Sequence, residues 1–522
     1  MLSKADCHFG PIRSAIWPIF HHEVKKLFPM IVMLFLICFN YSVLRNMKDA
    51  LIVTSSGAEV IPFIKVWAIL PMAVVLTLIF TKLSNRYSQE KVFYIMTSGF
   101  LILFALFSFV LYPFRDVLHP MQTADYLQSM LPAGFKGLIS MFRYWTFTLF
   151  YVMSELWSTI VMFVLFWGFA NEITRLGEAR RFYSVLSIAS NFAAIAAGLT
   201  SIYISHEGIF NPSIPLGHDS WEQTMMLLMI LVILSGILTM ATFRWMNKNV
   251  LNDPSYDDLH QIKREVKKKG KLSFKESVSY VSGSKYLLGI AVIVVAYNLS
   301  INLSEVIWKD QIKNLYPGAT EYNNYINNLT AIQGVVSTLL SVGLAQMISR
   351  FGWTKTALIT PIVMAVTCVG FFGFLFFQND LAPFFLSWLG MAPLSIAVFF
   401  GSAQNCLSKA SKYSVFDATK EMAYIPLSHE SKLKGKAAID GVGSRLGKSG
   451  GSLLHQGFLM IFATVSASAP YVAIFMIGVI ALWVVAIRSL GLQFDNLVAQ
   501  REQETISKLE QEEASEKAAA VV

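Results

Sequence analysis

The stretch from Lys434 to Gly451, KGKAAIDGVGSRLGKSGG, places charged side chains directly before a long apolar run. It is rich in small residues, which let helices pack closely, and a charge within a membrane span is costly unless it faces a cavity or a partner. Asp440, Ser444 and Lys448 recur every four residues, so they share one face of a helix. We interpret that face as the lining of a polar site.

The same stretch imitates a phosphate-binding loop. A P-loop needs glycine, four residues and then Gly-Lys-Ser/Thr, placed between a strand and a helix. Gly447-Lys448-Ser449 has Val442 where the first glycine belongs, and no strand pattern precedes it. A membrane enzyme that uses nucleotides is therefore the weaker hypothesis, and we predict no catalytic residue.

Three further apolar stretches carry charged or polar side chains on one helical face. They contain Arg45 and Lys48, then Glu155, then Asn302 and Glu305. Such charges either pair with one another as bridges or gates between helices, or they line a cavity. Four stretches with inward polar faces favour a cavity. The excess of Lys and Arg favours an anionic substrate, because these donors suit phosphate oxygens.

The composition belongs to a membrane protein. Of 522 residues, 55% are hydrophobic and 14% are charged, against about 25% charged in soluble domains. About twelve apolar runs are long enough to cross a bilayer, which predicts an all-α, polytopic, major-facilitator-like fold of two six-helix halves. The runs lie near residues 28–53, 60–81, 92–113, 138–170, 182–205, 222–245, 286–309, 324–349, 356–377, 382–408, 436–465 and 469–488.

Two sequence matches support a duplicated architecture. Arg86–Lys91 and Arg350–Lys355 share the form Arg-aromatic-x-x-x-Lys, and Lys48-Asp49 corresponds more loosely to Lys309-Asp310. We predict five regions: a cytoplasmic interfacial segment, two helical bundles separated by a basic linker attracted to membrane lipid, and a frayed or disordered tail. Their bounds are 1–27, 28–245, 246–285, 286–490 and 491–522, with an interfacial helix from Ile12 to Lys26.

Basic residues orient the chain. Lys and Arg concentrate in the even-numbered loops and before the first span, so both termini should be cytoplasmic. These loops account for the net charge of +9, and no nucleic-acid partner is expected. Neither the four cysteines nor the nine histidines have metal-ligand spacing, so we expect no metal and no cofactor.

Three long motifs give the chain a family resemblance. LFWGFANEITRLGEARRFY (Leu165–Tyr183), KYSVFDATKEMAYIPL (Lys412–Leu427) and the stretch Lys434–Gly451 closely resemble the ATP/ADP translocases of obligate intracellular bacteria and plant plastids, and the likeness runs from about Phe28 to Leu490. It implies a nucleotide antiporter with twelve helices. It also implies functional roles for the matching charges, which are Lys48, Glu155, Glu305 and Lys448.

The leading hypothesis is therefore an exchanger of ATP for ADP, with or without phosphate, acting as a monomer in the bacterial inner membrane. A broader nucleotide importer and a carrier of another organic anion remain open. The expected substrate-binding or gating residues are Lys48, Glu155, Glu305, Lys448, Arg45, Asn302 and Asp440. The base that is recognised also remains open, because Tyr41, Tyr151, Tyr297 and Trp157 could stack on a base or simply pack.

Overall fold

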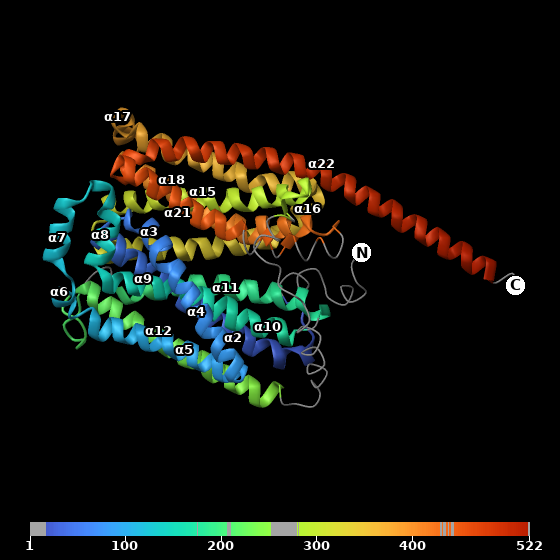
Figure 1. The fold of residues 1–522 in the computed structure, drawn as a ribbon, viewed down its shortest axis with the longest axis horizontal. Helices are drawn as coiled ribbons and strands as arrows, with labels where there is room; N and C mark the ends of the chain where they lie inside the picture. Colours follow the sequence, from blue (N-terminus) through green and yellow to red (C-terminus); the bar gives the residue numbers. More distant parts are fainter. Residues whose placement is uncertain are drawn as a thin grey trace.

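The computed structural model describes residues 17–519 except 175, 206–209, 252–278, 280, 428–430, 432–434, 437 and 440–442. Its described residues form helices and connecting turns without β-strands, and the long helices run side by side in one bundle (Figure 1). The short helices α6 (Arg115–Leu118), α7 (Met121–Met130) and α17 (Gln378–Leu389) mark one end, which we call the far end. Helix α22 (Val465–Ala519) leaves the bundle at the opposite end, which we call the terminal end.

The first half of the chain crosses the bundle six times. The crossings are α2 (His21–Ser56); α3 (Val60–Phe63), η2 (Ile64–Ile69) and α4 (Leu70–Arg86); α5 (Gln89–Leu106) and η3 (Phe107–Leu111); α9 (Trp145–Trp157), η5 (Ser158–Phe166) and α10 (Trp167–Ile173); α11 (Leu176–Ser205); and α12 (Ser220–Met246) with η7 (Asn247–Leu251). Elements η2, η3, η5 and η7 are π-helical turns within these crossings. Local chemistry sets some boundaries: Asp219 caps α12 by accepting from the Glu222 amide at 2.8 Å.

The second half also crosses six times. Its elements are α15 (Lys285–Leu315); α16 (Ala319–Phe376); α18 (Pro393–Ser411) with η10 (Lys412–Phe416) and α19 (Asp417–Ala423); α21 (Ser444–Phe462); and α22. Helix α16 contains two crossings, because Gly352 has φ 76° and ψ 174°, a conformation that suits glycine. Nine helices of the described chain are apolar and long enough to span a membrane. Residues 319–349, α18 and α21 complete the predicted twelve, which confirms the fold class.

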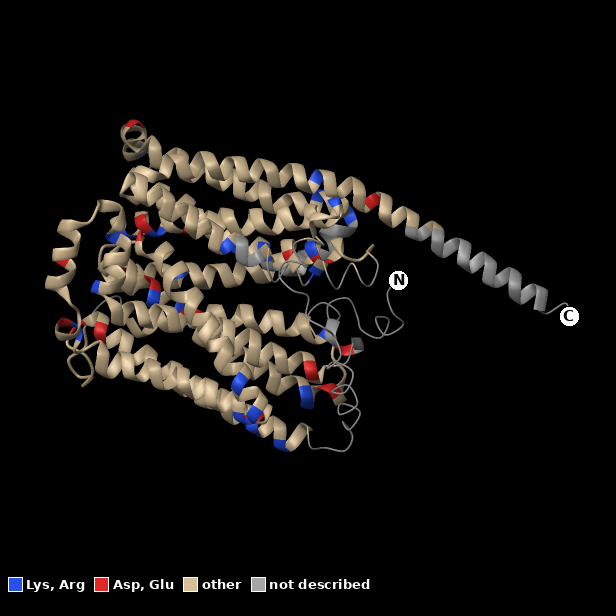
Figure 2. Cartoon of the chain, in the orientation of Figure 1, with Lys and Arg blue, Asp and Glu red and all other residues tan. Residues whose placement is uncertain are grey.

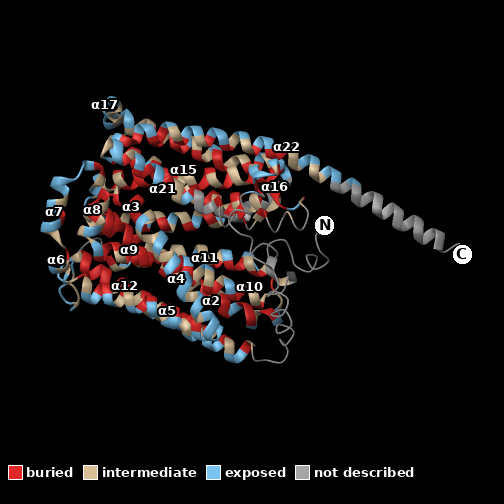
Figure 3. Ribbon diagram, in the orientation of Figure 1, coloured by how far each residue is buried: buried red, intermediate tan, exposed pale blue. Residues whose placement is uncertain are grey.

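Burial separates central helices from peripheral ones (Figure 3). Helix α4 has no buried residue, and its Leu78 and Ile79 are exposed, as expected of a surface that meets lipid. In contrast, α2 and α15 bury charged side chains, Lys48 and Lys309 among them. Buried charges need partners, so the polar site must lie where these central helices meet.

Two predicted spans have the wrong boundaries. The span 138–170 begins too early, because α8 (Lys136–Arg143) ends at Tyr144, whose φ of −109° and ψ of 50° interrupt the helix before α9. The span 382–408 is broken at Gly390, which has φ 63° between α17 and α18. Both breaks lie inside runs that were delimited by hydropathy. Local signals stand beside them, since Arg143 precedes the first break and Gly390 and Pro393 flank the second, and the fourth span could already be interpreted as two short segments.

The ends of the chain also differ from expectation. Residues 21–26, predicted as part of an interfacial helix, are the first turns of α2, and residues 1–16 lie outside the described chain. The tail predicted to be frayed is helical, since α22 continues to Ala519. Ala, Glu and Lys are strong helix formers, which explains the difference. Of the predicted linker, residues 252–278 lie outside the described chain.

Candidate functional site

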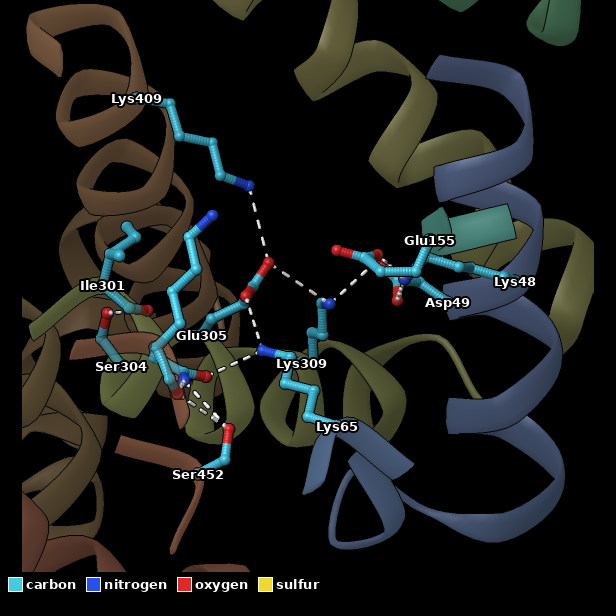
Figure 4. Close-up of polar contacts among 12 residues, drawn as sticks. Lys48, Asp49, Lys65, Glu155, Ile301, Ser304, Glu305, Lys309, Lys409 and Ser452 are labelled. Atoms are coloured by element: carbon cyan, nitrogen blue, oxygen red, sulfur yellow. Dashed lines mark hydrogen bonds and ion pairs between the residues drawn. The ribbon is translucent and has the colours of Figure 1, made fainter. Parts of the chain in front are cut away.

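Figure 2 shows Lys, Arg, Asp and Glu positions inside the bundle as well as at its ends, and Figure 4 shows charged side chains from both halves meeting there. They lie toward the ends of α2 and α15 that are nearer the far end. We call this group the charge cluster. Its members are Lys48 and Asp49 of α2, Lys65 of η2, Glu155 of α9, Glu305 and Lys309 of α15, and Lys409 of α18. Four lysines face three carboxylates, so the cluster carries a formal excess of one positive charge.

Lys48 is held entirely by its own half. Its Nζ lies 3.0 Å from Asp49 Oδ1 and 3.1 Å from Glu155 Oε2, and only 2% of the side chain is exposed. The ammonium also sits 3.6 Å from the centre of the Tyr151 ring, a cation–π contact. Two carboxylates and an aromatic face compensate for the loss of water around this cation.

Asp49 joins the two halves. Its second carboxylate oxygen, Oδ2, lies 2.8 Å from Nζ of Lys309 on α15. Lys309 in turn lies 3.3 Å from Oε1 of Glu305, one helical turn earlier. The first helix of one half is thereby tied to the first helix of the other through buried ion pairs.

Glu305 is shared among three lysines. Besides Lys309, its carboxylate lies 3.5 Å from Nζ of Lys409 and 3.6 Å from Nζ of Lys65. Lys65 comes from the first half and also donates to Oδ1 of Asn302 at 2.7 Å. Glu305 is consequently the second carboxylate through which the halves are connected.

Lys448 differs from the other lysines. Its backbone carbonyl accepts from Nδ2 of Asn302, which also donates to Oγ of Ser452 at 3.0 Å, so α21 is fixed against α15. Its side chain is exposed and forms no ion pair with a described residue. Its charged neighbours are two cations, Lys412 and Lys65, and two carboxylates, Glu155 and Glu305. Lys448 thus presents an ammonium beside the cluster that is available to an anion.

The predicted site residues fall into three groups. Lys48, Glu155, Glu305 and Asn302 come together in or against the charge cluster. Arg45 lines a small cavity whose walls include four members of that cluster, Asp49, Glu305, Lys309 and Lys409. Lys448 lies beside the cluster and forms no ion pair with a described residue, so of the two roles open to these charges, pairing or lining a cavity, the described contacts show no pairing for it. Asp440 lies outside the described residues.

Sequence reasoning missed several partners. Asp49, Lys65, Lys309 and Lys409 were not among the expected site residues. Lys65 lies within the second predicted span and Lys409 at the end of the tenth, so an isolated charge in an apolar run was a usable signal. What the sequence could not supply is which lysine faces which carboxylate.

The segment that resembles a P-loop has a helical conformation in the structure. Gly447-Lys448-Ser449 lies inside α21, so its backbone amides belong to a helical segment and do not form a phosphate cradle. Gly447 instead allows close packing, because a Cβ there would lie 2.7 Å from Cβ of Asn298. The small residues of this stretch let α21 approach α15.

Two of the aromatic candidates for base stacking are packed in the core. Tyr297 stacks on Phe416 at 4.9 Å, and Trp157 donates to the carbonyl of Ile37 at 3.1 Å. Tyr151 lies under the ammonium of Lys48. In this conformation these three rings contact other groups of the protein, so none of them is free to stack on a base.

The described polar contacts between the halves all involve residues toward the far end. Asn46 donates to Oδ1 of Asn327 at 2.7 Å, and Trp67 donates to Oε1 of Gln456 at 3.1 Å. Gln456 also donates to the carbonyl of Pro62 at 2.9 Å. Together with the ion pairs of the charge cluster, these contacts close the far end.

Known proteins resemble the chain in both sequence and fold. The profile of the TLC ATP/ADP transporter family matches residues 2–494. ADP,ATP carrier protein 1 of Chlamydia pneumoniae is 45% identical over 97% of this chain and 98% of its own length. ADP,ATP carrier protein 1 of Rickettsia bellii is 40% identical over 95% and 98%.

Solved transporters share the architecture at low identity. A bacterial metal transporter superposes with a TM-score of 0.53 at 12% identity, covering 90% of this chain and 99% of that one. A D-xylose-proton symporter gives 0.52 at 14%, covering 89% and 96%. These likenesses show the fold alone, and that fold is major-facilitator-like. From the match over nearly its whole length, the chain belongs to the TLC ATP/ADP transporter family, and it is a multi-pass membrane protein.

Proposed function

We propose that this protein exchanges ATP for ADP across the bacterial inner membrane by alternating access. One observation carries the proposal beyond family membership: a buried, lysine-rich charge cluster joins the two halves, with Lys448 beside it. A polyphosphate is a multivalent anion, so it suits a site with an excess of cations. The proposed binding or gating residues are Lys48, Glu155, Glu305, Lys448, Arg45 and Asn302.

Exchange follows from competition between carboxylates and phosphates. In the empty carrier Glu305 holds Lys65 and Lys409. A bound polyphosphate offers these lysines an alternative partner, and the contacts that close the far end can then be exchanged for contacts with substrate. Without an anion, separating the halves leaves buried charges unpaired, which is costly. Idle cycling is therefore slow, and each turnover carries a nucleotide in both directions.

The test uses purified protein in liposomes. Vesicles loaded with ADP should take up labelled ATP at least ten times faster than empty vesicles, because the return step requires a bound anion. Equal uptake into empty vesicles would contradict obligate exchange and favour a net nucleotide importer. Conversion of ATP to another product without a gradient would identify an enzyme. Adding phosphate together with ADP inside the vesicles decides whether phosphate accompanies ADP.

The proposal includes a topology. Two six-helix bundles, 28–245 and 286–490, form a monomer whose termini lie in the cytoplasm, and in this orientation the far end faces outward. Single cysteines at Lys268 and at Glu502, in a variant without native cysteines, test this arrangement with a membrane-impermeant reagent. Neither should react in intact cells, and both should react after permeabilisation. Reaction in intact cells would reverse the orientation.

A further inference from the structure

The connection between the third and fourth crossings covers part of the far end. It comprises residues 115–143, which form α6, α7, η4 (Ala133–Phe135) and α8, and we call it the far-end cap (Figure 1). Most side chains of α7 are exposed, so this helix is not part of the packed core. No member of the charge cluster comes from the cap. The cap therefore needs an explanation that substrate binding does not provide.

The described polar contacts of the far-end cap all stay within the first half. Arg143 binds Asp125 at 2.6 Å and donates to Gln128 at 2.9 Å, which holds α7 and α8 together. Two further contacts attach the cap to neighbouring elements: the ion pair Lys136–Glu59 at 2.8 Å and the hydrogen bond His119–Thr146 at 2.7 Å. These contacts tie the cap to the start of α3 and to α9, so it should move with the first half as one body.

The cap meets the second half through bare backbone. Element η4 packs against α21, and Gly134 is buried in this contact. A Cβ on Gly134 would lie 2.7 Å from Cα and 2.9 Å from the carbonyl oxygen of Met460. Because carbon atoms in contact are about 3.5–4.0 Å apart, a side chain here would force η4 and α21 apart by about 1 Å. The φ of Gly134 is not positive, so the contact depends on the missing side chain and not on backbone freedom.

The contact between Gly134 and Met460 lies next to hydrogen bonds that join the halves. Gln456 precedes Met460 by one turn of α21. It accepts from Trp67 at 3.1 Å and donates to the carbonyl of Pro62 at 2.9 Å, and both partners belong to the first half. An increase of about 1 Å would carry both contacts beyond hydrogen-bond distance. The close approach at Gly134 is therefore a condition for the contacts of Gln456.

We infer that the far-end cap is a spacer that sets how closely the two halves meet at the far end, with Gly134 as the seat for α21. No described hydrogen bond or ion pair joins η4 to α21, so this contact can separate and form again without leaving a buried charge unpaired. A side chain at Gly134 shifts the population toward molecules with an open far end. The inference rests on the proposed alternating access and adds a residue that sets the balance between its two states.

Distances across the far end test the inference. Nitroxide labels are attached to cysteines introduced at Ser213, between α11 and α12, and at Asn379 of α17, in a variant without native cysteines. Both positions are exposed, they belong to different halves, and neither lies in the cap, so a shift of the cap alone leaves their separation unchanged. Pulsed electron paramagnetic resonance in liposomes gives the distance distribution. In Gly134→Val the ratio of long to short distances should rise at least about threefold, because the closed form loses at least one hydrogen bond.

Matched controls isolate the seat. Ala133→Val enlarges the exposed neighbour of Gly134 in η4, and Gly457→Ala adds a Cβ to α21 where no neighbouring atom lies within 4 Å. Both should leave the distance ratio within about 1.5-fold of wild type. Gly134→Val combined with Met460→Ala should stay as open as Gly134→Val, because the obstructing atoms belong to the backbone of Met460. Gly134→Ala should raise the ratio less than Gly134→Val does.

The outcomes separate this inference from the proposed exchange. An unchanged ratio in folded Gly134→Val would overturn the inference, and so would an equal rise in Ala133→Val or recovery of the wild-type ratio by Met460→Ala. If Gly134→Val does not elute as folded protein, Gly134→Ala decides by the same criteria. ATP uptake into ADP-loaded liposomes is measured in parallel. Absence of ADP-dependent uptake in wild type would reject nucleotide exchange, while the distances still decide whether the cap acts as a spacer.

Discussion

The two halves place the same dipeptide on their first helices, Lys48-Asp49 on α2 and Lys309-Asp310 on α15, but they use it differently. Asp49 binds its own Lys48 and the Lys309 of the other half. Asp310 accepts from Gln311 at 3.2 Å and from Ser466 at 3.4 Å, both in its own half. The same dipeptide thus supplies one carboxylate that joins the halves and one that does not.

This difference explains the charge excess of the cluster. If both aspartates faced inward, four carboxylates would neutralise the four lysines. With Asp310 turned away, the cluster keeps one uncompensated positive charge, which an anionic substrate can neutralise. The asymmetry between the halves is therefore a property that suits substrate binding, and it can be tested by removing each charge separately.

The largest effect is expected for Asp49→Asn. The substitution leaves Lys48 with one carboxylate and removes the direct link from Lys309 to the first half. Breaking a buried ion pair costs about 3–5 kcal/mol, so exchange in proteoliposomes should fall more than about 100-fold and the melting temperature should decrease. If exchange remains within threefold of wild type, the halves are not coupled through Asp49.

Two companion variants show whether an unbalanced buried charge causes the losses expected for Asp49→Asn. Asp49→Asn combined with Lys309→Gln removes the unpaired cation as well, so the double variant should recover melting temperature relative to Asp49→Asn. Asp310→Asn is the matched control in the other half, and its exchange rate should stay within about twofold of wild type. A large loss in Asp310→Asn would show that the dipeptides are functionally equivalent.

The second-largest effects are expected at Lys48, which is ion-paired, and at Lys448, which forms no ion pair with a described residue. If Lys48 and Lys448 bind phosphate as proposed, Lys48→Gln and Lys448→Gln should each reduce ATP/ADP exchange by about 10- to 100-fold, since each variant loses a charge-assisted bond. Lys448→Gln disturbs no described ion pair, so its melting temperature should match wild type, whereas that of Lys48→Gln should fall. Arg at either position should retain part of the activity. Wild-type exchange by both Gln variants would place the phosphate site elsewhere.

A smaller effect is expected at Lys65. Lys65→Gln removes the ion pair with Glu305 but can keep a hydrogen bond to Asn302, and Glu305 retains Lys309 and Lys409. Exchange should therefore drop only about three- to tenfold. A cysteine at Trp67 should react faster with an aqueous reagent in this variant, because the far end is held less tightly. Unchanged reactivity would mean that Lys65 does not help to close it.

The sequence predicted the fold far better than the contacts. Apolar runs of membrane length located all twelve crossings. The breaks at Tyr144 and Gly390 were missed because the runs were delimited by hydropathy, although Arg143 and Pro393 stand beside them. Lys48, Glu155 and Glu305 were found for the same reason that makes them functional candidates: a charge in an apolar helix demands an explanation. Asp49 bridges the halves because α2 packs against α15. The sequence of either helix alone does not reveal that packing.

The closed far end has a consequence for how nucleotide is sensed from each side. A site that must first open has an apparent dissociation constant equal to its intrinsic value divided by the fraction of open molecules. The contacts of Asn46, Trp67 and Gln456 lower that fraction for ligand arriving at the far end. Each 1.4 kcal/mol of closing energy weakens the apparent affinity there about tenfold, although the binding residues are the same. The two faces of the membrane thus meet one site with two effective affinities.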